Sequence, residues 1–334
     1  MLVIAHRGAS GERPEHTLAA YELAIDQGAD FIEPDLVVTS DGVLVARHET
    51  EISATTDIAT REEFSARRRS KEVDGMLVNG WFAEDFTLAE LRTLRAKERI
   101  PGVRPANARF DGLYQVPTLA DIVTLVRAKE AETGRRIGLY PELKHPDFLL
   151  QEEGIDVVDL LLLELKALNV TPADPVFIQC FEVGPLQRLA KRSDFKLVQL
   201  VAASGGPADE PDMRYAEMVT PSGLAAIAEY ADGIGAAIPL LLDADGEGTG
   251  VVAAAHEAGL LVHAWTVRRE NAFLPAALHS DVPNEGASML RMLLQRAGVD
   301  GVFDDFPRRD QEVPVAMTPP RPAVPRPAIP SDAR

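Results

Sequence analysis

Residues 2–27 read LVIAHRGASGERPEHTLAAYELAIDQ, and they contain the pattern from which the fold can be predicted. It begins with a short apolar run, Leu2–Ala5, of the kind found in strands that are buried on both faces of a parallel sheet. It ends with Thr17–Gln27, in which apolar residues recur at the spacing of an amphipathic helix. The stretch is therefore a strand, a loop and a helix, and the ionisable pair His6 and Arg7 lies where the strand meets the loop.

The same alternation of apolar runs and helical patterns continues along the chain. It predicts a parallel sheet covered by helices. Eight such units predict a closed (β/α)8 TIM barrel over residues 1–310, and the alternative fold is a doubly wound open sheet. The further strands expected are Phe31–Val38, Ile137–Leu143, Val176–Cys180, Lys196–Val201, Gly233–Ala237, Leu260–Thr266 and Gly301–Phe303. The further helices expected are Leu119–Ala131, Val157–Leu168, Pro185–Lys191, Ser222–Tyr230, Gly250–Ala258 and Ala287–Arg296.

Two segments depart from this rhythm. Residues 49–117 separate the second strand from its helix and are too long for a plain loop, so they predict a small insertion beside the face that carries the site. A short strand is expected just before it, at Val43–Ala46, and a helix within it, at Leu88–Lys97. Residues 311–334 are rich in proline and offer little to bury, which predicts a disordered or extended tail.

Composition limits the partners that we expect. The formal net charge is −18, and an acidic surface repels nucleic acid and anionic lipid. No stretch is long and apolar enough to cross a membrane, and no leader precedes the first strand. The chain as written is therefore expected to be cytoplasmic, whereas a trimmed or misplaced start would make it periplasmic or secreted. The sequence does not indicate an oligomeric state.

Polar side chains lie near the ends of the expected strands. In a (β/α)8 barrel, catalytic groups occupy the C-terminal ends of the strands, so these side chains should meet at one rim. Such convergence from distant parts of the sequence indicates a site more firmly than any single motif does. The candidates are His6, Arg7, Glu33, Asp35, His48, Glu142, Lys144, Gln179 and Trp265.

Three carboxylates form the expected metal site. Glu33 and Asp35 are alternate residues of one strand, so they point to the same side, and Glu142 lies at the end of the next strand. Three like charges close together are unstable unless a cation neutralises them. Because the ligands are oxygens and few imidazoles are near, the set favours Ca2+, with Mg2+ as the alternative. Without an ion, the same residues would form a salt-bridge network.

Two histidines are the acid–base candidates. His6 and His48 can titrate near neutral pH, so one could take a proton from an attacking oxygen while the other gives one to a leaving oxygen. A lone histidine would instead favour a structural role. The neighbouring Arg7 and the carboxylates favour the catalytic interpretation, and together these groups indicate phosphate-ester chemistry.

The remaining candidates allow two interpretations each. Arg7 and Lys144 could bind phosphate oxygens, or could only pair with the carboxylates. Gln179 could donate a hydrogen bond to a ligand, or could be a neutral hydrogen-bonding group of the core. Trp265 could form an apolar wall beside a polyol chain, or could simply pack within the barrel.

Six motifs between Leu2 and about Pro307 belong together. They are His6-Arg7-Gly8-Ala9, Pro14-Glu15-His16-Thr17, Glu33-x-Asp35, His48, Pro141-Glu142-Leu143-Lys144 and Gly301-Val302-Phe303-Asp304-Asp305-Phe306-Pro307. In these motifs the chain resembles the glycerophosphodiester phosphodiesterases. Three further segments look like the calcium-dependent periplasmic branch of the bacterial enzymes, at Val176–Phe181, Glu229–Gly235 and Thr266–Arg268.

The resemblance implies a (β/α)8 barrel with an insertion after the second strand. It implies hydrolysis of small glycerophosphodiesters, such as glycerophosphocholine and glycerophosphoethanolamine, to glycerol 3-phosphate and an alcohol. The roles it implies are metal ligation by Glu33, Asp35 and Glu142, acid–base catalysis by His6 and His48, phosphate binding by Arg7 and Lys144, and lining of the glycerol pocket by Trp265.

Three features depart from the family pattern. Pro34 lies between two of the expected metal ligands, Glu49 follows the second histidine where aspartate is frequent, and no leader is present. None of them removes a catalytic group. Two other functions remain open: a lysophospholipase D, with Trp81 and Phe82 as candidates for an acyl-chain groove, and a non-catalytic barrel that only binds a phosphodiester.

Overall fold

Parallel strand pairing joins the two ends of the described chain. The structure, a computed structural model, describes residues 1–308, and the tail expected at residues 311–334 lies outside them. The first strand, β1 (Leu2–His6), pairs with the last, β13 (Gly301–Asp304), and on its other side with β2 (Phe31–Glu33). The pairing continues through β7 (Gly138–Leu139), β8 (Glu142–Leu143), β9 (Phe177–Cys180), β10 (Lys196–Val201), β11 (Gly233–Ala237) and β12 (Leu261–Val267), which returns to β13.

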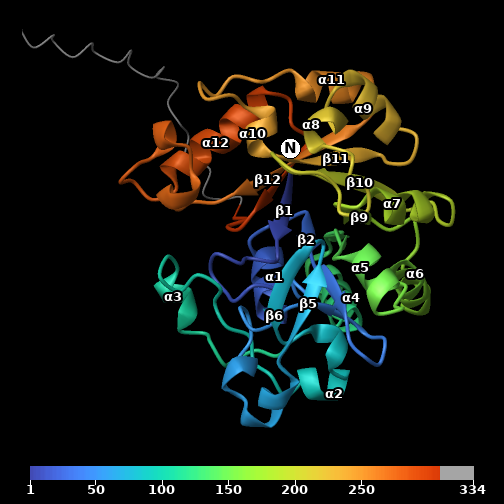
Figure 1. Ribbon diagram of the computed structural model, residues 1–334. Coiled ribbons are helices and arrows are strands. Elements are labelled where there is room, and N and C mark those ends of the chain that lie inside the picture. Colours follow the sequence, from blue (N-terminus) through green and yellow to red (C-terminus); the bar gives the residue numbers. More distant parts are fainter. Residues whose placement is uncertain (309–334) are drawn as a thin grey trace, which may run out of the picture.

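This ring of pairings is an α/β barrel of the TIM type rather than an open sheet. In Figure 1, β1 lies in the centre of the view, between β2 and β12.

Two of the expected strands are interrupted at prolines. Pro34 separates β2 from β3 (Asp35–Val38), and Pro141 lies between β7 and β8. Proline has no N–H to donate to a strand ladder. Pairing resumes at once, because the N–H of Glu142 donates to the carbonyl of Pro34 (3.0 Å) and Asp35 pairs with Glu142. The antiparallel strand β4 (Leu44–Ala46) then pairs with β3 at the edge of the sheet.

Helices connect the strands. α1 (Leu18–Asp26) begins at Thr17, whose hydroxyl accepts a hydrogen bond from the N–H of Ala20 (3.1 Å). α4 (Leu119–Thr133) begins with a capping box at Thr118 and ends before Gly134, which has a left-handed φ of 68°. The other helices of the barrel are α5 (Pro146–Glu152), α6 (Val157–Ala167), α7 (Val183–Ala190), α8 (Tyr215–Met218), α9 (Pro221–Ile227), α10 (Ile238–Leu241), α11 (Val251–Glu257) and α12 (Glu285–Arg296). Single 3-10 turns lie at Asn271–Phe273 and Ala276–Leu278.

The interior of the barrel is aromatic and contains one buried histidine. Tyr140 stacks on Phe177, with ring centroids 5.2 Å apart, and meets the edge of Phe303 at 5.1 Å. The hydroxyl of Tyr140 lies 2.6 Å from Nδ1 of His263, which is fully buried. These rings fill the interior of the barrel beneath its C-terminal rim.

The 49–117 segment packs around a hydrophobic cluster that it shares with Val37 of β3 and Val45 of β4. A hairpin of β5 (Arg69–Val73) and β6 (Met76–Gly80) turns at Asp74-Gly75, and two short helices follow, α2 (Leu88–Leu91) and α3 (Pro105–Ala108). Figure 1 shows these elements beside the blue N-terminal half of the barrel. The segment also contains 3-10 turns at Ile58–Thr60, Glu62–Arg67 and Ala83–Asp85.

The helix expected at Leu88–Lys97 is wrong beyond Leu91. The chain becomes extended there, because the backbone of Ala96 is paired instead with neighbouring loops. Its N–H donates to the carbonyl of Tyr114 (2.8 Å), and it forms a bridge with Thr56. Long-range pairing therefore overrides the local helical pattern.

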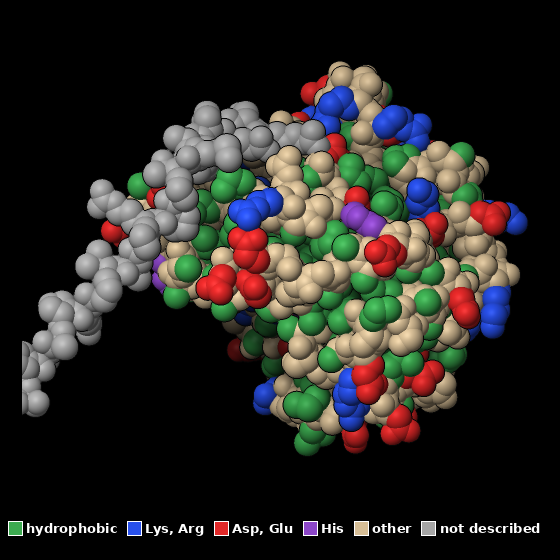
Figure 2. Space-filling view, turned by 90° about the horizontal axis from the view of Figure 1, so that it is seen from above, with side chains coloured by type: hydrophobic (Ala, Val, Ile, Leu, Met, Phe, Trp, Pro, Cys, Tyr) green, Lys and Arg blue, Asp and Glu red, His purple; other side chains and the backbone are tan. Residues whose placement is uncertain are grey.

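The surface carries charges of both signs. Figure 2 shows acidic and basic side chains scattered over one face, with hydrophobic side chains between them. None of the helices within residues 1–308 is long and apolar enough to span a membrane.

Candidate active site

A cavity of about 430 Å³, a volume that includes open solvent, lies at the C-terminal rim of the barrel. This is the rim at which catalytic groups are expected in such a barrel. Of the nine candidate residues, only Asp35 does not line the cavity, because it is fully buried beside it. The lining candidates are His6, Arg7, Glu33, His48, Glu142, Lys144, Gln179 and Trp265.

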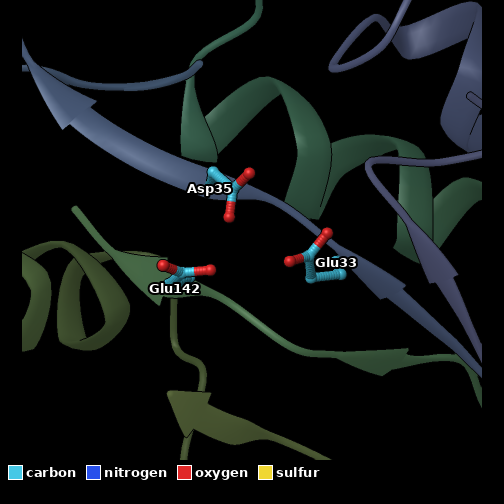
Figure 3. Close-up of side chains that lie close together, drawn as sticks. All are labelled: Glu33, Asp35 and Glu142. Carbon is cyan, nitrogen blue, oxygen red and sulfur yellow. The ribbon is translucent and has the colours of Figure 1, made fainter. Parts of the chain in front are cut away.

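The three carboxylates face one another across two neighbouring strands. Figure 3 shows Glu33 and Asp35 on one side and Glu142 opposite them, with their oxygens directed into a shared space. One ligand oxygen from each lies within 4.8 Å of the other two. Oxygens that bind the same Ca2+ lie at most about 5 Å apart, twice the usual metal–oxygen distance. The spacing therefore fits a cation with oxygen ligands.

The electrostatics of the cluster are those of crowded like charges. Burial, together with the charges of Asp35 and Glu142, raises the pKa of Glu33 well above its usual range. Burial also raises the pKa of Glu142, to about 8. Burial acts in the same direction on Asp35, but Lys144 and then His16 outweigh it and hold the pKa of Asp35 well below its usual range.

The hydrogen bonds of the cluster leave ligand atoms available. Glu33 accepts from the backbone N–H of Arg7 (2.7 Å) and from Nε2 of Gln179 (3.0 Å). Asp35 accepts through Oδ2 from His16 (2.8 Å), while its buried Oδ1 has no hydrogen bond among residues 1–308. Lys144 lies 2.5 Å from Glu142 and 3.5 Å from Oδ1 of Asp35, so it only partly neutralises three acids. The residues present therefore fit a divalent cation.

His6 is held by a buried carboxylate. Its Nδ1 lies 2.6 Å from Oδ1 of Asp305, the residue that follows β13. Burial, with Arg7 adding to it, lowers the pKa of His6 to about 4, so the imidazole is neutral near pH 7. Asp305 in turn accepts from Arg104 (2.5 Å) and Arg268 (3.1 Å).

His48 has a similar arrangement on the other side of the cavity. Its Nδ1 contacts the carboxylate of Glu49, which accepts two hydrogen bonds from Arg99 (2.8 and 2.7 Å). Burial, with Arg7 adding to it, lowers the pKa of His48 to about 3. The side chain of His48 is 30% exposed against 10% for His6, so His48 is the more open to solvent.

Arg7 is placed by a tight turn at the end of β1. Arg7 and Gly8 both have left-handed φ values, 61° and 84°. A side chain at Gly8 would meet the backbone of Ala20 at 2.6 Å, so α1 packs here against a position that only glycine can occupy. The guanidinium lies 3.3 Å from Glu15 and 3.5 Å from Asp35, and its Nε is buried without a hydrogen bond among residues 1–308.

The two neutral candidates take structural contacts at the rim of the cavity. Gln179 donates to Glu33 and so orients one of the three carboxylates. The indole N–H of Trp265 donates to the carbonyl of Gly235 (2.8 Å), and the ring meets the edge of Phe181 with centroids 5.7 Å apart. Both side chains also line the cavity, where they can contact a ligand as well as make these structural contacts.

A second cavity adjoins the first. It encloses about 1040 Å³ of space, including open solvent, and shares His48, Lys144, Phe181 and Trp265 with the first. Tyr215 lies on its wall. A ligand in the first cavity could therefore extend a substituent into the second.

Four residues that contact the site were not expected from the sequence. Asp305 could have been predicted as a site residue, because it lies just after an expected strand. Arg99 and Arg104 lie in the 49–117 segment, whose sequence has no strand–helix rhythm to place them. Arg268 follows β12 by one residue, so the strand-end rule would have found it.

The fold and this site together define an α/β-barrel enzyme. A profile of the "Glycerophosphoryl diester phosphodiesterase family" matches residues 6–309. The chain belongs to this family of phosphoric diester hydrolases.

Curated relatives agree with this assignment, and solved structures share the fold. The chain is 34% identical over 319 residues to a glycerophosphodiester phosphodiesterase of Arabidopsis thaliana (91% of this chain, 83% of the relative). It is 32% identical over 335 residues to one of Haemophilus influenzae (92% and 87%). A crystal structure from Silicibacter pomeroyi, of a protein described as a putative glycerophosphoryl diester phosphodiesterase, has the same fold. Its TM-score is 0.66 at 24% identity, covering 93% of this chain and 92% of that one. The fold is shared with a phosphodiesterase of Oleispira antarctica, solved in complex with the product sn-glycerol-3-phosphate (TM-score 0.61, 21% identity, 93% and 95% covered).

Proposed function

We propose that this protein hydrolyses small glycerophosphodiesters to glycerol 3-phosphate and an alcohol, with a divalent cation held by Glu33, Asp35 and Glu142. The observation that carries the proposal is the meeting of these carboxylates with two neutral imidazoles and two cations around one cavity. Ca2+ is the ion that we favour and Mg2+ the alternative, because both prefer oxygen ligands. The likeness to the calcium-dependent periplasmic branch supports Ca2+.

In this proposal the chain's own residues bind the phosphate and move the protons. Arg7 and Lys144 bind phosphate oxygens, since both line the cavity beside the carboxylates. His6 and His48 are the acid–base pair: one takes up the proton of the attacking oxygen at its free Nε2, and the other, once protonated at Nε2, gives that proton to the leaving oxygen. The cation, when bound, neutralises charge that develops on the phosphate oxygens. The attacking oxygen is either the adjacent glycerol hydroxyl, which gives a cyclic phosphate that water then opens, or water itself.

The two cavities indicate how a substrate would lie. We place the glycerol phosphate in the cavity with the carboxylates, against Trp265, and the alcohol substituent in the adjoining cavity beside Phe181 and Tyr215. The Oleispira antarctica structure, which shares the fold and holds sn-glycerol-3-phosphate as product, supports glycerol 3-phosphate as the product here. Glycerophosphocholine and glycerophosphoethanolamine are the substrates that we would test first.

The alternative functions are less well supported by the structure. Trp81 and Phe82, proposed for an acyl-chain groove of a lysophospholipase D, are buried: the indole of Trp81 donates to the carbonyl of Phe64 (2.7 Å), and Phe82 is fully buried. A barrel that only binds a phosphodiester would not need both histidines together with all three carboxylates.

For the domain limits we keep the prediction made from the sequence, a barrel over residues 1–310 that contains the 49–117 segment.

The test is release of glycerol 3-phosphate from glycerophosphocholine. The protein is stripped of metal with a chelator and then given Ca2+ or Mg2+. We expect release only after an ion is restored. No release with either ion, from glycerophosphocholine or glycerophosphoethanolamine, would overturn the proposal and make lysophospholipids the next substrates to try.

A further inference from the structure

Both proposed catalytic histidines are held in the same way, each through a carboxylate that an arginine holds in turn. For His48, the sequence of contacts is His48, Glu49 and Arg99, with Arg99 donating to both carboxylate oxygens. For His6, it is His6, Asp305 and Arg104, with Arg104 lying 2.5 Å from Asp305. The histidines and carboxylates come from three distant parts of the chain, whereas the two arginines are only five residues apart.

A carboxylate that contacts Nδ1 decides which imidazole nitrogen carries the proton. An ionised carboxylate can only accept, so Nδ1 of each neutral histidine must donate to it. Nε2 then lacks a proton and is the atom free to accept one. Among residues 1–308 the structure gives Nε2 of neither histidine a hydrogen-bond partner, and both rings line the cavity.

The arginines are themselves anchored by further contacts. Arg104 is buried, and it also donates to Glu270 (2.6 Å) and to the carbonyl of Ser10 (3.2 Å). Arg99 donates to Glu15 (2.9 and 2.7 Å), which also contacts Arg7. Contacts of this number and burial fix the positions of the two carboxylates, whereas a single exposed ion pair would not.

We propose that Arg99 and Arg104, carried by one loop of the 49–117 segment, are positioning residues that orient Glu49 and Asp305 and thereby set the Nδ1–H tautomer of both catalytic histidines. The inference rests on the proposed function for the roles of His6 and His48. In this proposal the 49–117 segment contributes to catalysis in addition to covering part of the barrel. Neither arginine touches the cavity's carboxylate cluster. Arg104 reaches the site through Asp305 and His6, whereas Arg99 also contacts Glu15, which pairs with Arg7.

The first test reads the tautomers directly, without substrate. In protein labelled with 15N at histidine, nitrogen chemical shifts distinguish Nδ1–H from Nε2–H. We expect the Nδ1–H form for His6 and His48. Asp305→Asn should convert His6 to Nε2–H, because Arg104 and Arg268 will hold the amide oxygen and turn the amide N–H groups toward Nδ1. An Nε2–H tautomer of His6 in the unaltered protein, or an unchanged tautomer in Asp305→Asn, would overturn the proposal.

The second test separates positioning from folding. Arg104→Gln should lower kcat on glycerophosphocholine about 10-fold or more, with KM nearly unchanged, because proton transfer is impaired and phosphate binding is not. Arg104→Lys keeps a cation beside Asp305 and should recover part of the loss. Arg109→Gln is the matched control, since Arg109 lies in the same segment, is exposed, and places its guanidinium over the Phe110 ring.

The outcomes of the two tests are distinct. Equal kcat values for Arg104→Gln and Arg109→Gln would contradict the proposal, as would a loss that Arg104→Lys does not reverse. Arg99→Gln extends the comparison to His48, and KM is expected to change as well as kcat because Arg99 also contacts Glu15 beside Arg7. If no variant and no unaltered protein releases glycerol 3-phosphate, the proposed function fails, and the tautomers still decide whether the arginines position the histidines.

Discussion

His6 and His48 are the residues on which hydrolysis should depend most. Replacing either by alanine removes one proton-transfer group and leaves the carboxylates and cations in place, so we expect kcat to fall roughly 10²–10⁴-fold. Initial rates of glycerol 3-phosphate release measure this. His256→Ala is the control, because His256 lies on the surface, away from the cavity. Near-normal turnover in both His6→Ala and His48→Ala would exclude the acid–base assignment.

At the scale of residues, the sequence indicated the groups at strand ends and could not indicate their partners. His6, Glu33 and Glu142 follow or end apolar runs, and the geometry of a barrel brings such positions together. Arg104 meets Asp305 across 201 residues, through a loop whose path depends on tertiary packing. No local pattern encodes that contact. Asp305 itself could have been found, since it follows a strand.

At the scale of elements, His263 on β12 makes the interior of the barrel sensitive to acid. Burial lowers its pKa to about 4, against about 6.5 in an unfolded chain. The unfolded state therefore binds a proton first as the pH falls. With respect to His263, the free energy of unfolding has its full value above pH 6.5, falls progressively between pH 6.5 and pH 4, and stays constant below pH 4.

This predicts a measurable change in the free energy of unfolding. Between pH 7 and pH 5, His263 alone should cost the unaltered protein about 2 kcal/mol. His263→Gln cannot take up the proton and can still bond to Tyr140, so its loss over the same range should be smaller by about that amount. Urea unfolding at the two pH values tests this, with the surface variant His256→Gln as control. The same loss in His263→Gln as in the control would show that another group is responsible.

The elements themselves were largely predictable, and the exceptions have physical causes. All seven helices expected outside the 49–117 segment are present, because amphipathic spacing reports burial on a helix face. Pro34 and Pro141 divide two expected strands, since a missing N–H interrupts the ladder. The β5–β6 hairpin was missed although Asp74-Gly75 is a favoured hairpin turn. The helix expected to reach Lys97 ends at Leu91, where pairing with other loops takes over.

At the scale of the whole molecule, a bound cation should stabilise the barrel. An ion that binds only the folded state at 100 times its Kd adds about 2.7 kcal/mol, which for a barrel of this size raises Tm by roughly 5 °C. We expect this rise on adding Ca2+ to the stripped protein. Glu142→Gln should abolish it. Glu182→Gln should not, because Glu182 is a buried carboxyl outside the cluster whose pKa burial raises to about 9, so glutamine resembles its neutral form.

Scanning calorimetry with and without Ca2+ measures these shifts. An equal rise in Tm for Glu142→Gln and Glu182→Gln would show that the ion binds elsewhere than at the three carboxylates.

The class of the fold was predictable at this scale, since strand and helix alternate throughout. The path of the 49–117 segment over the rim was not, because it follows from contacts between segments that are far apart in sequence.

The pairing of the first strand with the last bears on how the protein is made. His6 and Asp305 are 299 positions apart, so their contact cannot exist until nearly the whole barrel has been synthesised. A ribosome delivers the N-terminal strands long before the last strand, and a domain generally folds as a unit. A nascent or truncated chain can thus present Glu33, Asp35 and His48 without a correctly oriented His6. Hydrolysis would begin only on release of the final strand, so the active site itself reports that the barrel is complete.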